Sequence, residues 1–230
     1  LIALVQARII GLGPVVMSLE ASASEATLEW DGHEVNHQWS KSEEAEGLLQ
    51  DMLGPQAGLS AGAYFSLLRP YSEIQIARYF ADLPEYHPVI TSCNRAFRQG
   101  VEDARWCGEC DKCRFIFLIL SPFIPSTSLT RMFADNLLDN PTQVEGYRAL
   151  LGLHEHRPFE CVGEQAESLL SFTWIAHQSD WSKSAVVSAL TQEMPELLHP
   201  HPELEDRVLG ERNGRLHLPA PFETLGSVLA

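Results

Sequence analysis

Four of the five cysteines in this chain lie within 21 positions, from Cys93 to Cys113. Cys107, Cys110 and Cys113 follow one another at C-x-x-C-x-x-C spacing, and Cys93 lies upstream. Three thiolates at this spacing can fold around one ion, and a fourth completes a tetrahedral shell. Gly108 permits the tight turn between the first two ligands. We therefore interpret the cluster as a structural zinc site, which has no open position for chemistry.

The residue types alone also allow an iron–sulfur cluster or a coincidence. An iron–sulfur cluster usually has its fourth cysteine close downstream, often followed by proline, whereas here Arg114 and Phe115 follow Cys113. Coincidence accounts poorly for so dense a group. Five cysteines are too few for a secreted disulfide framework, so we expect a protein of the reducing cytoplasm.

Polar side chains gather in two segments, of which the second favours a phosphate or carboxylate site. The first, M-S-L-E-A-S-A-S, follows a short apolar run and could equally be an ordinary polar loop. The second, N-H-Q-W-S-K-S, leads into a predicted helix, where Lys41 is electrostatically unfavourable unless an anion compensates. The candidate residues of the two segments are Glu20, Ser22, Asn36, His37, Ser40 and Lys41.

Further candidates are arginines and their neighbours, in a chain with few basic residues. Arg69 precedes a proline and a second predicted helix start, in S-L-L-R-P-Y-S-E, which ends at Glu73. Next to Cys93 lie Asn94, Arg95 and Arg98, where a metal knuckle would hold the two guanidinium groups in fixed positions. Each arginine alone could be a solvated surface charge, but together they favour an anionic ligand.

The fifth cysteine lies between two carboxylates in P-F-E-C-V-G-E. A lone Cys161 between apolar neighbours is often a small core residue. The alternative is that Cys161, with Glu160 or Glu164, transfers protons at an active site. Both interpretations stay open from the residues alone.

The first third of the chain has the pattern of an α/β protein. A helix over residues 1–10 ends at Gly11, and residues 15–17 suit a buried strand. Asp31-Gly32 predicts a hairpin over residues 27–35. Helices are expected over residues 43–53, capped by Ser42 and ended by Gly54-Pro55, and over residues 73–81, capped by Ser72.

The remainder of the chain is predicted to be mainly helical. The apolar run from Phe115 to Leu120 suits a helix only if it is buried. Further helices are expected over residues 129–138, 143–151, 164–177 and 185–193, with breaks such as Asn-Pro between them. From Leu198 the H-P-H-P and L-P-A-P-F segments predict an extended tail.

Composition limits the class of partner. The 230 residues carry a formal net charge of -15, with 31 acidic residues against 16 Lys and Arg. Such a field repels nucleic acids and anionic membranes, but permits a small anionic substrate bound by local cations. No apolar run reaches the ~20 residues that span a bilayer. Because the chain opens on Leu1 in a helical pattern, we expect native residues upstream.

The motifs together resemble a known family. The segment S-C-N-R…C-G-E-C-D-K-C-R resembles the zinc knuckle of 7-cyano-7-deazaguanine synthases, which are PP-loop ATP pyrophosphatases. Taken with V-V-M-S-L-E-A-S-A-S, V-N-H-Q-W-S-K-S, S-L-L-R-P-Y-S-E-I-Q-I-A-R and P-F-E-C-V-G-E, residues 1–195 resemble the MurL family of UDP-N-acetylmuramoyl-L-alanyl-L-glutamate epimerases. The resemblance implies an adenine-nucleotide hydrolase-like (PP-loop) parallel sheet and helical region. We therefore expect three regions. Residues 1–125 form an α/β part that includes the zinc knuckle at 93–113, residues 126–197 form a helical region, and residues 198–230 form an extended tail.

The resemblance also implies an activity in bacterial peptidoglycan synthesis. The terminal L-glutamate of the UDP-linked muramoyl dipeptide would be adenylated with ATP and magnesium, inverted to D-glutamate, and released with AMP. Glu20 would contact magnesium or nucleotide; Lys41, Arg69, Arg95 and Arg98 would contact phosphate or carboxylate groups. Cys161 with Glu160 or Glu164 would transfer the Cα proton.

The chain departs from the family pattern at two places. The superfamily's S-G-G-x-D-S phosphate loop is absent and is expected before Leu1, and Leu19 stands where the motif has Asn. Two alternatives to the epimerase therefore remain: another PP-loop adenylating enzyme, resembling the deazaguanine synthases or modifying tRNA, and a non-catalytic zinc-stabilised binding domain. The acidic charge of the chain argues against a tRNA substrate.

Overall fold

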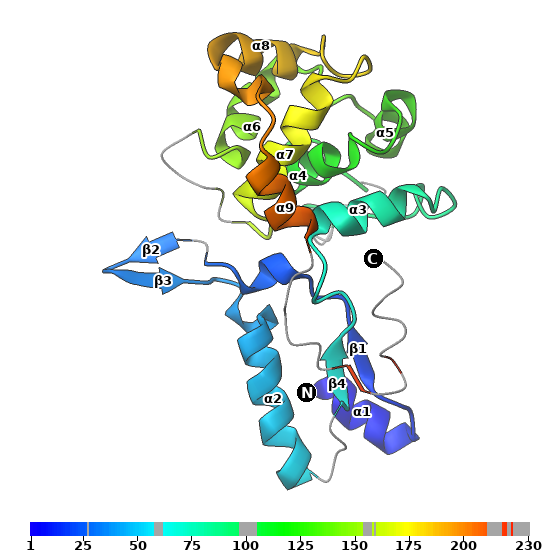
Figure 1. Ribbon diagram of the computed structural model, residues 1–230. Coiled ribbons are helices and arrows are strands. Elements are labelled where there is room, and N and C mark those ends of the chain that lie inside the picture. Colours follow the sequence, from blue (N-terminus) through cyan, green and yellow to red (C-terminus); the bar gives the residue numbers. More distant parts are fainter. Residues whose placement is uncertain are drawn as a thin grey trace. The chain divides into compact units, whose positions relative to one another are not determined.

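The structure is a computed structural model that describes residues 1–26, 28–57, 62–96, 105–153, 158, 160–210, 218–219 and 222. Its described part is a mixed α/β chain with a small parallel sheet (Figure 1). It divides into two compact units, one of residues 1–72 with 211–230 and one of residues 73–210. This boundary after Ser72 differs from the division expected near residue 125.

The first unit is built on a pair of short parallel strands. Helix α1 (Ile2–Ile10) ends at Gly11, whose φ of 71° is left-handed, as the sequence predicted. Strand β1 (Val15–Met17) pairs in parallel with β4 (Tyr64–Ser66), with Val16 opposite Phe65. The expectation that β1 is buried was wrong, since Val16 is 46% exposed. In the described chain β1 has β4 as its one strand neighbour, so its other edge lacks a strand.

The predicted hairpin is present in the same unit. Strands β2 (Leu28–Trp30) and β3 (His33–Val35) pair antiparallel across a two-residue turn. Asp31 has a φ of 51° and Gly32 one of 74°, as a type I′ turn requires at both central positions. Short 3-10 turns, η1 (Ala21–Ser24) and η2 (Trp39–Lys41), flank the hairpin.

Helix α2 (Glu43–Ala57) begins where expected but runs further. The Ala45 N–H donates to Ser42 Oγ at 3.1 Å, which confirms the predicted cap. Gly54-Pro55 does not end the helix. Pro55 lies in the last turn, where its missing N–H removes one terminal hydrogen bond, and the helix ends two residues later. With 15 residues, α2 is the longest described helix, and none of the described helices qualifies as a membrane span.

The second unit is helical, and its helices match most of the predicted ranges. The helix over residues 185–193 was predicted with both ends correct, as was that over residues 73–81. Helix α5 stops five residues earlier than expected, because Ala134 adopts a left-handed φ of 59°. The elements are α3 (Glu73–Ala81), α4 (Asp111–Leu120), α5 (Ser126–Phe133), η3 (Pro141–Gln143), α6 (Val144–Leu150), α7 (Gln165–Ala176), α8 (Ala185–Glu193), η4 (Pro195–Leu198) and α9 (Pro202–Leu209).

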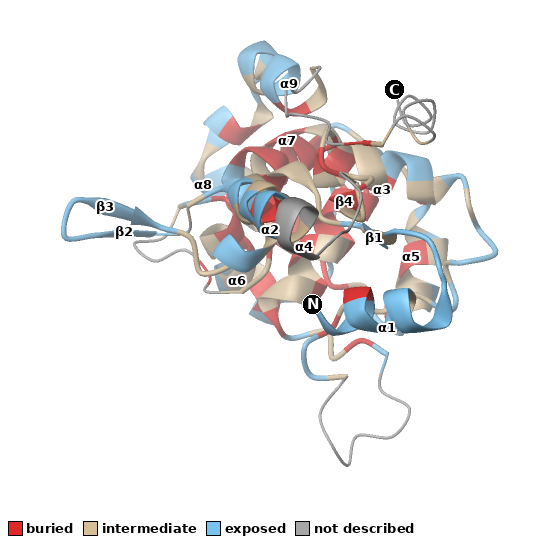
Figure 2. Ribbon diagram, turned by 90° about the horizontal axis from the view of Figure 1, so that it is seen from below, coloured by how far each residue is buried: buried red, intermediate tan, exposed pale blue. Residues whose placement is uncertain are grey.

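Helix α4 lies at the centre of the apolar core of this unit. Phe115, Phe117 and Leu118 are fully buried, as the apolar run predicted. Helices α3, α5, α6 and α7 pack against α4, and α7 is itself largely buried (Figure 2). Each buried Phe or Leu side chain contributes about 1.5–3 kcal/mol by leaving water. The core therefore fixes the segment that carries Cys110 and Cys113.

Helix α9 lies in the part of the chain that was expected to be an extended tail. Pro202 occupies its first turn, where a proline is compatible with a helix. The fully buried Val208 anchors it. Leu204 and Leu209 are partly buried against the core beside it. Three apolar residues among many charged ones are a weak sequence signal, so the tertiary contacts of α9 decide that it folds as a helix.

Candidate functional site

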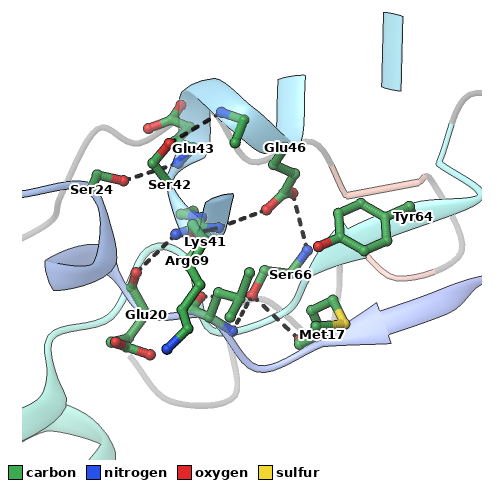
Figure 3. A network of polar contacts seen from close by, with 12 residues as sticks. Met17, Glu20, Ser24, Lys41, Ser42, Glu43, Glu46, Tyr64, Ser66 and Arg69 are labelled. Carbon is green, nitrogen blue, oxygen red and sulfur yellow. Dashed lines mark hydrogen bonds and ion pairs between the residues drawn. The ribbon is translucent and has the colours of Figure 1, made fainter. Parts of the chain in front are cut away.

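Polar side chains of the first unit meet at the carboxyl end of its parallel strands. Because β1 and β4 run parallel, Glu20 after β1 and Arg69 after β4 leave the sheet at the same edge. Figure 3 shows Glu20, Lys41 and Arg69 gathered there. This edge is where ligands bind in open α/β sheets.

The buried Arg69 guanidinium organises the cluster. Nη1 donates to the Glu20 carbonyl oxygen at 2.9 Å, and Nη2 donates to the Lys41 carbonyl oxygen at 2.8 Å. Nη2 also forms an ion pair with Glu46 Oε2 at 2.9 Å, with both side chains 3% exposed. Arg69 Nε is buried without an acceptor in the described chain. Arg69 thus joins both polar segments to α2, and these donors are used inside the protein.

Two residues that the sequence analysis missed complete this network (Figure 3). The Ser66 N–H donates to Glu46 Oε1 at 3.0 Å, so both Glu46 oxygens are used. Ser66 Oγ accepts the Leu19 N–H at 2.7 Å and lies 2.6 Å from the Leu19 carbonyl oxygen. A serine ending a strand and an acid in the first turn of a helix are common, so only their burial reveals this role.

The other candidate residues of the two polar segments also lie in this unit. Asn36 Nδ2 donates to the Ala23 carbonyl oxygen at 2.9 Å, and its Oδ1 accepts the Gln38 N–H at 2.7 Å. Lys41 Nζ donates to Gln38 Oε1 at 3.2 Å. Asn36 therefore connects the segment around η1 to the segment around η2. Ser22 is buried with Oγ 3.5 Å from Glu20 Oε1, His37 is half-buried, and Ser40 is exposed.

The four cysteines of the second unit form a compact group of sulfur atoms. All four Sγ atoms lie within 4.8 Å of one another. Cys113 Sγ is 3.7 Å from Cys107 Sγ and 3.5 Å from Cys110 Sγ. Tetrahedral ligands about 2.3 Å from zinc are about 3.8 Å apart, so the spacing fits such an ion. The cysteines that the sequence singled out can hold one metal ion.

Backbone groups support the sulfur atoms as ligands. The Cys107 N–H points to Cys93 Sγ at 3.4 Å, and the N–H groups of Glu109 and Cys110 point to Cys107 Sγ at 3.4 and 3.3 Å. Gly108 has a φ of 69°, which gives this turn its left-handed step. The hydrogen bond between Cys110 and Cys113 lowers the pKa of Cys110 and raises that of Cys113, so Cys110 is the thiolate of this pair.

The residues beside Cys93 are less enclosed than expected of a binding site. Asn94 and Arg95 are exposed. Arg95 Nη1 forms a 2.8 Å ion pair with Glu109, on the turn that carries the cysteines. Arg98 lies outside the described residues.

Glu160 and Glu164 each accept hydrogen bonds at the start of a helix. Glu160 Oε2 accepts the Lys112 N–H at 3.0 Å, in the first turn of α4. Glu164 is the N-cap of α7 in a capping box, and its Oε2 pairs with Arg207 at 2.9 Å. Cys161 lies half-buried between them. Both carboxylates that were predicted to be catalytic thus stabilise helix starts.

A third carboxylate, Glu167, links two helices and was missed from the sequence. Its fully buried side chain accepts the Glu73 N–H at 2.6 Å through Oε1 and the Glu164 N–H at 2.7 Å through Oε2. Glu167 thereby caps α3 and α7 together. Glu73, a predicted binding residue, has its own carboxylate 3.9 Å from Lys112 Nζ. The sequence signal was the E-x-x-E spacing of a capping box.

Family models and curated proteins both match this chain. The model of the MurL N-terminal domain matches residues 1–67, and that of the MurL C-terminal domain matches residues 89–205. A UDP-N-acetyl-alpha-D-muramoyl-L-alanyl-L-glutamate epimerase of Salinispora tropica is 53% identical over 85% of this chain and 43% of its own length. A protein of the same name from Micromonospora sp. is 47% identical over 96% of this chain and 49% of its own length. Another from Xanthomonas oryzae pv. oryzae is 43% identical over 83% of this chain and 43% of its own length.

The chain therefore spans less than half the length of these curated relatives, between 43% and 49%. No solved structure matches the chain significantly.

Proposed function

Because this chain belongs to the MurL family, we propose that it forms part of an ATP- and magnesium-dependent epimerase of the bacterial cytoplasm. The reaction would invert the terminal L-glutamate of UDP-N-acetylmuramoyl-L-alanyl-L-glutamate for peptidoglycan synthesis. The observation that carries this proposal is the match of both family domains, in order, along one chain. The polar cluster at the carboxyl edge of β1 and β4 supports it, since a PP-loop sheet would bind nucleotide at that edge.

The chemistry accounts for the need for ATP. A free α-carboxylate makes the neighbouring Cα–H a very weak acid, because deprotonation places a second negative charge on the same group. Adenylation removes one charge and allows the carbanion to delocalise as an enolate. Proton transfer to the opposite face of Cα then inverts the centre, and hydrolysis releases AMP.

In the first unit, we assign direct and supporting roles separately. Glu20 would contact magnesium or the nucleotide, and Lys41 a phosphate. Arg69 is better suited as a positioning residue, because its guanidinium already holds the backbone of Glu20 and Lys41. The remaining proposed binding residues are Ser22, Asn36, His37 and Ser40 in this unit, and Glu73, Asn94, Arg95 and Arg98 in the second.

In the second unit, we propose that the four cysteines hold a structural zinc ion. Four thiolates leave no open position, so the ion would keep Cys93 close to the start of α4. Cys161 remains the proposed proton-transfer group, because its thiol is half-buried in a loop held at both ends. Glu160 and Glu164 would position this loop through the helix starts that they cap.

Solvent exchange tests this function. The protein that carries this chain, given ATP, magnesium and the L-Ala-L-Glu precursor in deuterated water, should incorporate deuterium at the glutamate Cα as AMP forms. Absence of both deuterium and D-glutamate, with a competent precursor, would reject epimerisation. A Cys161→Ala variant should lose exchange while keeping its metal; unchanged exchange would reject only the role of Cys161.

A further inference from the structure

A cavity in the second unit has no role in the proposal above. It measures about 480 Å³, which is within the range of small-molecule sites. It lies between the segment that precedes α4 and helix α5. Six of its lining residues carry the argument: His87, Arg105, Trp106, Ser128, Arg131 and Phe133.

The cavity is positively charged in a strongly acidic protein. The chain has 31 Asp and Glu against 16 Lys and Arg. Nevertheless, the described lining contains Arg105 and Arg131 and neither Asp nor Glu. Among the described residues, neither arginine has an ion-pair partner. Two such guanidinium groups in one concave site favour an anion, because each offers a planar fork of donors to phosphate oxygens.

An aromatic wall stands beside the two arginines. Trp106 stacks on Phe133, with ring centroids 4.2 Å apart and planes at 28°. The edge of Phe117, on the core helix α4, contacts Phe133 at 5.1 Å between centroids. Trp106 also directly precedes Cys107 of the cysteine cluster. Trp106 is 9% exposed, so most of its indole is fixed in the core, and the part that lines the cavity offers a ligand a rigid apolar contact.

Polar groups complete the lining. Ser128 and Arg131 are three residues apart on α5, so they lie on one face of that helix. His87 Nε2 lies 3.1 Å from the Phe80 carbonyl oxygen, which can only accept, so Nε2 is the donor. Nδ1 is then the ring nitrogen that remains for a ligand.

From this combination we propose that the cavity binds the nucleoside diphosphate part of a ligand. The exposed Arg105 and Arg131 would bind the two phosphates, and the part of Trp106 that lines the cavity would contact the base. The proposal deepens the proposed function and rests on it for its candidate ligands, since the precursor carries uridine diphosphate and ATP carries an adenosine diphosphate group.

Calorimetric titration with UDP and, separately, ADP tests the site on the protein that carries this chain. At least one of the two should bind, and higher salt should weaken that binding. Arg131→Ala and Arg105→Ala should each lower the affinity about tenfold or more, since each removes charged hydrogen bonds. Arg78→Ala is the matched control, because Arg78 is exposed on α3 and does not line the cavity.

The outcomes separate two ligand sources. Tighter binding of UDP assigns the cavity to the precursor, and the KM for the precursor should then rise in Arg131→Ala with kcat and metal content retained. ADP binding that weakens in Arg105→Ala and Arg131→Ala assigns the cavity to the co-substrate. ADP binding that these variants leave unchanged belongs to the nucleotide site proposed at the carboxyl edge of β1 and β4. No binding of either nucleotide, or arginine variants that bind like Arg78→Ala, would overturn the proposal. Deuterium exchange would then still proceed, whereas failure of the proposed function would abolish exchange without affecting nucleotide binding.

Discussion

Each of the two units is stabilised internally by a different kind of interaction. In the first unit, the buried Arg69–Glu46 ion pair and the Ser66 backbone N–H connect β4 to α2, and the Ser66 hydroxyl bonds the Leu19 backbone after β1. In the second, a continuous apolar cluster surrounds α4, and the cysteines anchor one end of that helix. Hydrogen bonds and ion pairs place backbone groups accurately. Removing one side chain of a buried ion pair is strongly destabilising, because it leaves the other charge buried without a partner. Apolar packing distributes its stability over many contacts.

Exposure of apolar side chains shows the same contrast. On α1, Ile2 is 86% exposed and Ile9 is 77% exposed, while Leu4 is the buried residue of that helix. On α4, six of ten residues are buried. The first unit therefore has less apolar burial to offset a lost polar contact.

The largest expected effect comes from the cysteine centre. Cys113→Ser should reduce the metal content from about one ion per chain and lower the unfolding temperature of the second unit by more than about 10 °C, because metal binding is coupled to folding. Metal analysis and calorimetry measure both quantities. Cys161→Ser, which changes the thiol outside the cluster, should keep the metal; equal metal loss in both variants would contradict the four-cysteine assignment.

The second largest effect on stability is expected when Arg69 is replaced. Arg69→Ala leaves Glu46 buried without its partner and should cost about 3–5 kcal/mol of unfolding free energy. Hydrogen exchange of the β1 and β4 amides would report it locally. Arg8→Ala, an exposed arginine of the same unit, should change stability by less than about 0.5 kcal/mol.

A double variant sharpens the interpretation of Arg69. Arg69→Met combined with Glu46→Leu removes both charges, so it should be more stable than Arg69→Ala. If instead the double variant loses as much as Arg69→Ala, the backbone bonds to Glu20 and Lys41 matter more than the ion pair.

The smallest effect on stability is expected at the ion pair of the half-buried Arg148 with the exposed Glu193, whose charged groups lie 2.6 Å apart. The hydrogen bond from Arg148 lowers the pKa of Glu193. The carboxylate therefore stabilises the fold above its unfolded pKa of about 4.3, and this is lost as pH falls through the lower folded value. Glu193→Gln should lower the unfolding temperature slightly at pH 6 and not at pH 2, whereas Glu205→Gln should show no such dependence.

Local sequence signals predicted most of the secondary structure. Asp31-Gly32 predicts its hairpin because both positions need a left-handed backbone, and Ser42 predicts the start of α2 because its hydroxyl satisfies a free N–H. The spacing of the cysteines likewise identified a group that can hold a metal ion. Such signals act over a few residues, so they are readable before the chain folds. Pro55 was wrongly expected to end α2, because the free-energy cost of a proline in a helix depends on its position, and Pro55 lies in the last turn.

Contacts between residues far apart in the sequence were not predicted. Glu46 and Arg69 are 23 positions apart, and Glu167 lies 94 positions from the Glu73 N–H that it binds. The fold made Arg69 an internal support, gave Glu160 and Glu164 helix starts to cap, and brought Arg105 and Arg131 to one cavity. Residue type and spacing thus identified a group that can hold a metal ion, most of the helices and the family. The partner of each buried charge depended on which segments pack together, since burial and distance determine what a charged group binds.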